Sequence, residues 1–213
     1  SNATISAVSE LRLGAVADVD DGNPEAIAGS GGLIASGAGV SDIRIGRSVL
    51  VEVAQGVELE SAGELLVEAV ETSATRAKVS ALAVAGIGVG VSVANALRDS
   101  TITVSLAQGT NAPSLRARTL NIEARRFGEV KADVNLLTAG AIAVGVTSGF
   151  ARDRSDVTID LGGADLDART VNVIAKNAGD VLADAFGVVG GLGASGVNNA
   201  NAKREANTRV FAR

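Results

Sequence analysis

The chain has 213 residues and a formal net charge of −5 at pH 7, and its Lys and Arg residues are scattered, which argues against nucleic-acid binding through a basic patch. It contains no Cys, so disulfides and thiol chemistry are excluded, and no His, which removes the most common general base and metal ligand. Hydrophobic residues make up 46% of the chain but aromatic residues only 2%, and the 26 Gly residues suit a narrow interior whose cross-section repeats.

Near the N-terminus lies the strongest candidate metal site of the sequence. Asp18, Asp20 and Asp21 precede Gly22, and alternate carboxylates before a glycine can converge on Ca²⁺. The spacing departs from that of an EF-hand loop, and a solvated turn that closes on Pro24 explains these residues equally well. No other cofactor is expected.

A short phrase of alternating apolar residues recurs four times along the chain. It is centred on Ile43, Ile102, Val157 and Thr208, at steps of 59, 55 and 51 residues. Such recurrence indicates one supersecondary unit that stacks on copies of itself, each covering the apolar face of its neighbour. The alternation predicts an inward and an outward set of side chains. The inward set is Ile102, Val104, Val157 and Ile159, and the outward set is Thr103 and Thr158.

The whole chain divides along this repeat. Residues 1–3 resemble the remnant of a cleaved expression tag, and 4–213 are expected to form a single repeat domain cut at both ends from a longer protein. The units of about 51–59 residues are 4–59, 60–114, 115–165 and 166–213. Each unit begins and ends with a strand of period two, because apolar and polar residues alternate in both places.

Between its two strands, each unit carries an uncharged run rich in Gly, Ala and Val, at 26–40, 79–97, 134–151 and 185–202. The run at 79–97 has the length of a membrane-spanning helix, but its Gly and Val residues would make a poor helix, and their spacing by twos favours strand. Both faces of such a strand are apolar or tiny. We therefore expect both faces to be covered, one by the interior and the other by a second layer of the same chain or by a homodimer partner.

The predicted fold is all-β. Because a unit is long for one turn of a narrow solenoid, the sequence predicts two coils per unit in a repeat β-solenoid, most simply a right-handed parallel β-helix. The alternative is a layered antiparallel sheet, in which each Gly-rich segment forms a hairpin near Gly86-Ile87-Gly88.

Several other motifs have a structural reading beside a functional one. Gly162 to Asp167 is similar to a calcium-binding nonapeptide repeat but lacks its third Gly and does not recur in tandem. The Gly-rich runs lack the strand–loop–helix context of a nucleotide site. Charged residues at 98–99 and 152–156 end two apolar runs and are interpreted as a solvated corner. A polysaccharide-degrading enzyme would need carboxylates that converge on one groove. The candidates for that role are Asp99, Asp153, Asp156, Asp160, Asp165 and Asp167.

Taken together, a strand followed by an Ala/Gly/Val run such as 85–97 and then Ser100-Thr101-Ile102-Thr103-Val104 resembles the repeats of haemagglutinin-like and leukotoxin-like large filamentous adhesins of Gram-negative bacteria. The resemblance covers the chain from about Ala26 to the end and rests on a compositional pattern. It implies export, an elongated β-helical shaft and a cell-surface location, and it carries over no catalytic residue.

From these features we expect a non-enzymatic structural or adhesive segment of a large secreted or surface-anchored adhesin. Its partners would be a host or neighbouring-cell surface protein or glycan, with no nucleic acid and no membrane insertion, and a homodimer could form through the apolar runs. The alternatives are a β-helical polysaccharide-degrading enzyme and a membrane-interacting Gly/Ala-rich toxin segment.

Overall fold

The computed structural model describes residues 3–20 and 22–212, apart from the side chains of Val19 and Asp20. This part of the chain is all-β, with ten strands and no helix. The strands are β1 (Ala3–Ala7), β2 (Glu10–Asp20), β3 (Glu25–Val53), β4 (Val57–Ser61), β5 (Glu64–Leu106), β6 (Ser114–Ala139), β7 (Ile142–Asp160), β8 (Asp165–Asn177), β9 (Asp180–Gly190) and β10 (Gly193–Phe211). The uncharged runs are therefore extended, as expected. No helix in the described residues is long and apolar enough to cross a membrane.

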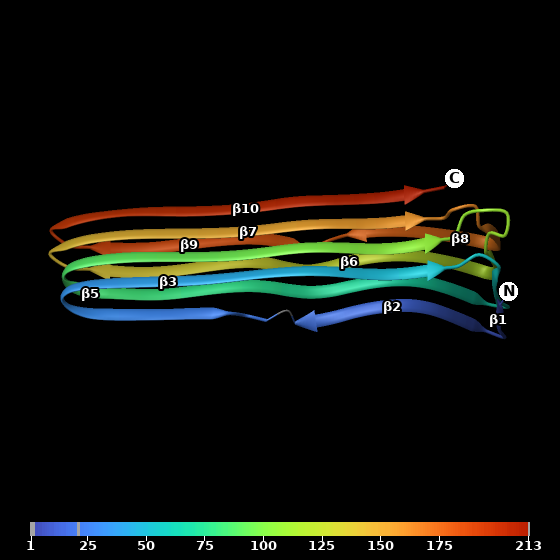
Figure 1. The fold of residues 1–213 in the computed structure, drawn as a ribbon, viewed down its shortest axis with the longest axis horizontal. Coiled ribbons are helices and arrows are strands. Elements are labelled where there is room, and N and C mark those ends of the chain that lie inside the picture. Colours follow the sequence, from blue (N-terminus) through green and yellow to red (C-terminus); the bar gives the residue numbers. More distant parts are fainter. Residues whose placement is uncertain (1–2, 21, 213) are drawn as a thin grey trace.

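All strand pairings in the described chain are parallel, and they build two long layers and one short stack (Figure 1). The outbound layer contains β2, the start of β3, 64–84 of β5, 119–139 of β6, the end of β8, and β9. The return layer contains the rest of β3, 87–106 of β5, β7 and β10. The end stack contains β1, β4 and the first residues of β6 and β8.

The antiparallel alternative is wrong. The chain does reverse direction near Gly86, but the two arms lie in different layers, and each arm pairs in parallel with the matching arm of the next unit. The Gly-rich segment is thus a turn between layers, where Gly86 passes close to the preceding unit: a Cβ there would lie 2.9 Å from the Leu33 carbonyl oxygen.

The strand register equals the sequence repeat over most of the chain. Ile102 pairs with Val157 and Val104 with Ile159, and all four side chains are fully buried, as predicted. The steps of 55 and 51 are confirmed by the pairs Ile102–Val157 and Val157–Thr208. The step of 59 is wrong, because Ile102 pairs with Val49 and not with Ile43. The alternating segment at Ser48–Val51 is the true counterpart.

Each unit makes one out-and-back passage before the next begins, so the expectation of two coils per unit is wrong. The reason is the width of the cross-section: a return strand such as β7 has 19 residues, and at about 3.3 Å per residue it spans about 60 Å. One flat, wide coil therefore takes all the residues of a repeat, whereas a narrow solenoid would form two coils from the same number of residues.

Inside the molecule, the core changes character along the strands. Towards the end stack it is built of large aliphatic side chains, among them Leu65, Ile102, Leu120 and Ile159. Towards the Gly-rich turns it contains mainly Ala and Val. There the two layers approach so closely that a Cβ on Gly37 would lie 3.0 Å from the Leu82 carbonyl oxygen. Small inward side chains therefore allow the two layers to touch.

Candidate functional site

Four charged side chains lie between the two core regions and form what we call the interior ion cluster: Glu71, Arg98, Arg126 and Asp153. All four are at most 1% exposed. Asp153 Oδ2 lies 2.7 Å from Arg126 Nη1, and Asp153 Oδ1 lies 3.6 Å from Arg98 Nε. The carboxylate thus bridges an arginine of the outbound layer and an arginine of the return layer.

Serine hydroxyls and a backbone carbonyl complete the cluster. Arg98 Nη1 donates to the Ser73 carbonyl at 2.8 Å and to its hydroxyl at 2.6 Å. The hydroxyls of Ser73 and Ser100 donate to Glu71 Oε1 at 2.9 and 3.0 Å, and the Ser155 hydroxyl donates to Asp153 Oδ1 at 2.5 Å. Two positive and two negative charges therefore share one buried space, which balances the charge in a medium where an isolated ion would be very costly.

The interpretation of 98–99 and 152–156 as a solvated corner is wrong for the alternate residues Arg98, Asp153 and Ser155. Side chains of a strand alternate between its two faces. Arg98 lies on the same inward face of β5 as Ile102, and Asp153 and Ser155 lie on the same inward face of β7 as Val157; only the residues between them face solvent. The alternation of inward and outward residues along each strand is the sequence feature that identifies the cluster. On the outbound side, the inward series Leu120, Ile122, Ala124 continues at Arg126. Sequence reasoning missed Glu71 and Arg126 because it did not extend this series.

The candidate catalytic carboxylates do not meet in one groove. Asp153 is enclosed by the interior ion cluster. Asp99 and Asp156 face outward on the return layer, where Asn207 donates to Asp156 at 2.7 Å. Asp160 ends β7 and accepts from the Gly162 amide at 3.0 Å. Asp165 and Asp167 lie in the end stack. The six candidates are thus divided among the interior, the outer face of the return layer and the end stack.

Of the calcium candidates, only Asp18 has a described side chain; the side chain of Asp20 and all of Asp21 lie outside the described residues. Asp18 is exposed on β2. Among the described residues, no group of three or more Asp or Glu side chains could hold a metal ion. Gly162 adopts a φ of 53° in the turn after β7, so this Gly serves the turn conformation.

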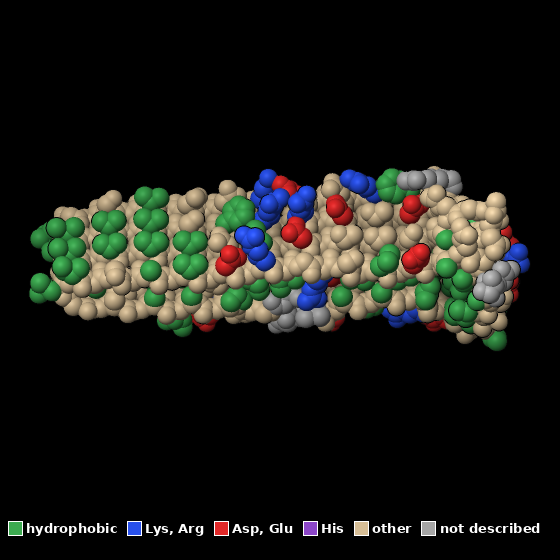
Figure 2. All heavy atoms as spheres, in the orientation of Figure 1, with side chains coloured by type: hydrophobic (Ala, Val, Ile, Leu, Met, Phe, Trp, Pro, Cys, Tyr) green, Lys and Arg blue, Asp and Glu red, His purple; other side chains and the backbone are tan. Residues whose placement is uncertain are grey.

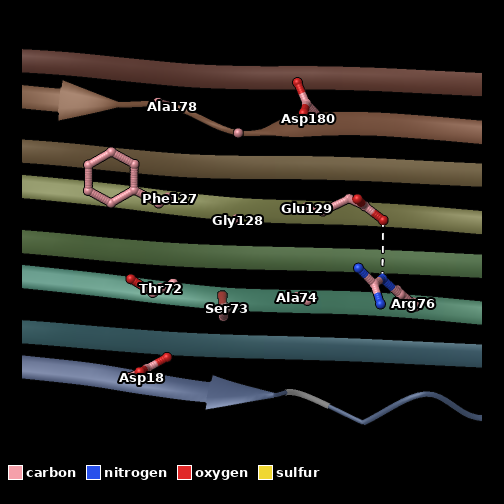
Figure 3. A pocket seen from close by; sticks show the side chains of 11 residues that line it. Asp18, Thr72, Ser73, Ala74, Arg76, Phe127, Gly128, Glu129, Ala178 and Asp180 are labelled. Atoms are coloured by element: carbon pink, nitrogen blue, oxygen red, sulfur yellow. Dashed lines mark hydrogen bonds and ion pairs between the residues drawn. The ribbon is translucent and has the colours of Figure 1, made fainter.

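A hollow of about 520 Å³ lies on the outbound face where β8 gives way to β9 (Figure 3). Asp18 and Asp180 lie on opposite sides of it, and Phe127 and Gly128 lie between them. Arg76 is already paired with Glu129, at 3.1 Å. The hollow is open, and the Ser73 hydroxyl in its lining is already used in the interior ion cluster, where it donates to Glu71. The described lining mixes charged, polar and apolar side chains.

Apolar side chains cover the outer surface of both layers near the Gly-rich turns. On the return layer they form regular columns across neighbouring strands, and Figure 2 shows these columns on the uncharged end of that face. We call them the return-face patch: Ile34, Val40, Ile87, Val89, Val91, Ile142, Val144, Val146 and Val197. On the outbound layer, Ile27, Leu82, Leu137, Phe186 and Val188 line a groove of about 450 Å³.

These surfaces correct the expectation that a second layer of the same chain covers the outer face of the uncharged runs; coverage by a homodimer partner stays a prediction. The inward Gly and Ala face is covered by the second layer of the same chain, as expected. The outward face, with its larger Val and Ile side chains, is exposed in the single chain. The reason is the parity of the runs: Gly88 and Gly90 point inward, so Ile87, Val89 and Val91 must point outward.

At the open edge of the return layer, β10 and its neighbour β7 together carry a charged trio. Lys203 and Arg152 both donate to Glu205, each at 2.5 Å, and these hydrogen bonds lower the pKa of the Glu205 carboxyl to about 2. The same hydrogen bond from Arg152 to Glu205 raises the pKa of the arginine. The trio lies just past the apolar end of β7 and β10 and links the two strands.

Comparisons with protein-family models, curated proteins and solved structures found no match to this chain.

Proposed function

We propose that the chain is a flattened, right-handed β-solenoid with one coil per repeat, and that it serves as a rigid shaft or binding surface in a large secreted or surface-anchored bacterial adhesin. The observation that carries this proposal is the in-register stacking of successive repeats, 51 to 55 residues apart. Each coil contacts only its neighbours, so such a molecule lengthens by adding repeats without redesigning its core.

The path of the chain supports the right-handed sense. In Figure 1 the return strands lie nearer to the viewer and run towards the end stack, the outbound strands lie behind them and run back, and the chain rises from β1 to β10. This path agrees with the general preference for right-handed crossovers between parallel strands.

The described side chains also favour a structural role over an enzymatic one. The only fully buried carboxylates in the described chain, Glu71 and Asp153, are held by serines and arginines inside the molecule. A polysaccharide-degrading enzyme remains the alternative of a different class. It would have to work with the outward carboxylates, which are spread over both layers and the end stack.

For the adhesive part of the proposal, the support is the resemblance to filamentous adhesin repeats. From this resemblance we infer a location outside the cell or on the outer membrane surface of a Gram-negative bacterium, with a host or neighbouring-cell protein or glycan as partner. Surface Lys and Arg side chains such as Lys78 and Arg76 are paired with carboxylates, which argues against a basic track for nucleic acid.

Two measurements on the purified chain test the proposal. Far-UV circular dichroism with small-angle scattering should give a sheet-rich particle with a longest dimension of about 60–70 Å. A panel of uronic-acid and neutral polysaccharides should yield no new reducing ends. Robust turnover that is lost in Asp99→Asn or Asp156→Asn would establish the enzymatic alternative, and a helical spectrum or a compact sphere would contradict the solenoid.

A further inference from the structure

We propose that the return-face patch is the contact surface of a homodimer, in which the patches of two copies pack face to face. The nine side chains of the patch are uncharged, and they are between 38% and 72% exposed. They form columns because partners in the strand register carry the same residue type, as in Ile87–Ile142, Val89–Val144 and Val91–Val146. The result is a flat, continuous apolar surface of the kind that soluble monomers rarely leave open.

The same strands show that the fold does not require apolar residues at these positions. Along β5, the outward side chains change from Ile87, Val89 and Val91 to Asp99 and Thr101, although the inward series and the strand pairing continue unchanged. Polar outward residues are thus compatible with this architecture. The apolar part of the face therefore calls for a partner.

A second copy fits the size and shape of the patch. Four strands about 4.8 Å apart, each contributing about eight residues at about 3.3 Å, give a flat area of about 500 Å² per copy. Two copies would together bury about 1,000 Å², which is the lower range of specific protein interfaces. Two β-sheets packed face to face interdigitate apolar side chains in this way, about 10 Å apart. Since the patch holds no charge, packing it on itself buries no like charges.

A lipid bilayer fits the patch less well, for a reason of hydrogen bonding. Within the described residues, the return layer ends at β3 on one side and at β10 on the other, and neither strand has a further partner there. Open strand edges do not occur in the hydrocarbon core of a membrane, because their backbone groups would lose hydrogen bonds to water. In addition, these edge strands present Ser36, Ser195 and Asn199 between the apolar columns.

The principal test replaces the centre of the patch without changing its shape. Val89, Val91, Val144 and Val146 become Thr in one variant, which keeps the β-branched side chains that strands favour. Sedimentation equilibrium should show a dimer for the unmodified chain and a dissociation constant at least about a hundredfold higher for the variant, since each buried hydroxyl would lack a partner. The matched control, Leu82→Thr with Leu137→Thr on the outbound groove, should leave the dimer intact.

A cross-linking experiment gives an answer even if the Thr variant does not fold. The chain has no Cys, so Ser148→Cys at the margin of the patch and Ser80→Cys on the opposite face each introduce a single thiol. A bifunctional thiol reagent should join two copies of the first variant but not of the second. The dimer should also persist between about 0.1 and about 1 M salt, because apolar contacts are not screened.

Several results would overturn the proposal. They are a chain that stays monomeric at the highest soluble concentration, a dimer that survives the four Thr substitutions, and a dimer that is lost in the Leu82 and Leu137 control. Flotation of the chain with phosphatidylcholine vesicles, with loss of that flotation in the Thr variant, would assign the patch to lipid instead.

Discussion

At the scale of single residues, the interior ion cluster is the most demanding feature of the molecule. Buried ion pairs contribute little net stability against an apolar core, but removal of one partner leaves an uncompensated charge. Asp153 holds two arginines at once, from opposite layers. Its loss therefore affects both layers and two neighbouring units, because Arg98 belongs to the second unit and Arg126 to the third.

We predict that Asp153→Asn, which keeps the shape of the side chain, lowers the free energy of unfolding by about 3–5 kcal/mol, because Arg98 and Arg126 would share a dry interior with Glu71 alone. The control is Asp99→Asn, which changes an outward carboxylate on the same layer and should stay within about 0.5 kcal/mol. Denaturant unfolding measures both. Equal effects of the two substitutions would show that the cluster is not buried in solution.

Glu205 makes the edge strand β10 sensitive to acid. Its folded pKa of about 2 lies below the ordinary value of about 4.3, so the stabilisation from its pairing is complete above about pH 4.3 and is lost as the pH falls towards 2. NMR titration of the Glu205 carboxyl carbon should give a midpoint near 2. In Lys203→Ala the midpoint should rise towards 4, because one of its two donors is removed. A midpoint of about 4 in the unmodified chain would contradict the pairing.

At the scale of the elements, the sequence predicts strand periodicity well and the path of the chain only in part. The shifts of 55 and 51 become pairs such as Val104–Ile159 and Val157–Thr208 because parallel in-register stacking places like residues side by side. The shift of 59 fails because alternating apolar residues occur both at Ile43 and at Val49, and only the pairing partner distinguishes them.

Other features of the elements depend on information that local pattern does not contain. The length of a repeat does not show whether it forms one wide coil or two narrow coils, because the number of coils depends on where the chain turns in space. For the candidate site, the charged residues at 98 and 153 could have been assigned to the interior from strand parity. The exposure of the Val columns follows from the inward orientation of the Gly residues. The small distance between the two layers near the Gly-rich turns depends on contacts between layers, such as that of Gly37 with Leu82.

The close approach of the layers leads to a prediction at Gly145 of β7. A Cβ on Gly145 would lie 2.7 Å from Val189 Cγ2 and 3.2 Å from Leu136 Cδ2, so Gly145→Val should overpack the interior and cost about 1–3 kcal/mol. Gly46→Val is the control, because a Cβ there would meet no atom within 4 Å. Thermal unfolding of both variants measures the difference. If Gly145→Val is as stable as Gly46→Val, the two layers are not in contact near the Gly-rich turns.

At the scale of the whole molecule, the stack of units should tolerate the removal of one unit, provided that the interior charges still match. Ser114 and Asp165 are register partners, 51 residues apart, so deletion of 114–164 joins equivalent points of two units. The last unit would then stack directly on the second. Arg98 now pairs with Asp153, and Asp153 with Arg204, so the deletion would place Arg98 against Arg204.

We therefore predict that the shortened chain keeps its sheet-rich circular dichroism but is destabilised by two adjacent arginines, and that Arg204→Asp restores on the order of 2–4 kcal/mol to it. In the full-length chain the same substitution should have the opposite sign, since it would place a carboxylate beside Asp153. Denaturant unfolding of the four proteins completes the cycle. If Arg204→Asp changes the free energy of unfolding with the same sign in the full-length and the shortened chain, the units do not restack in register. The units would then not be interchangeable, although a shaft of stacked repeats depends on that property.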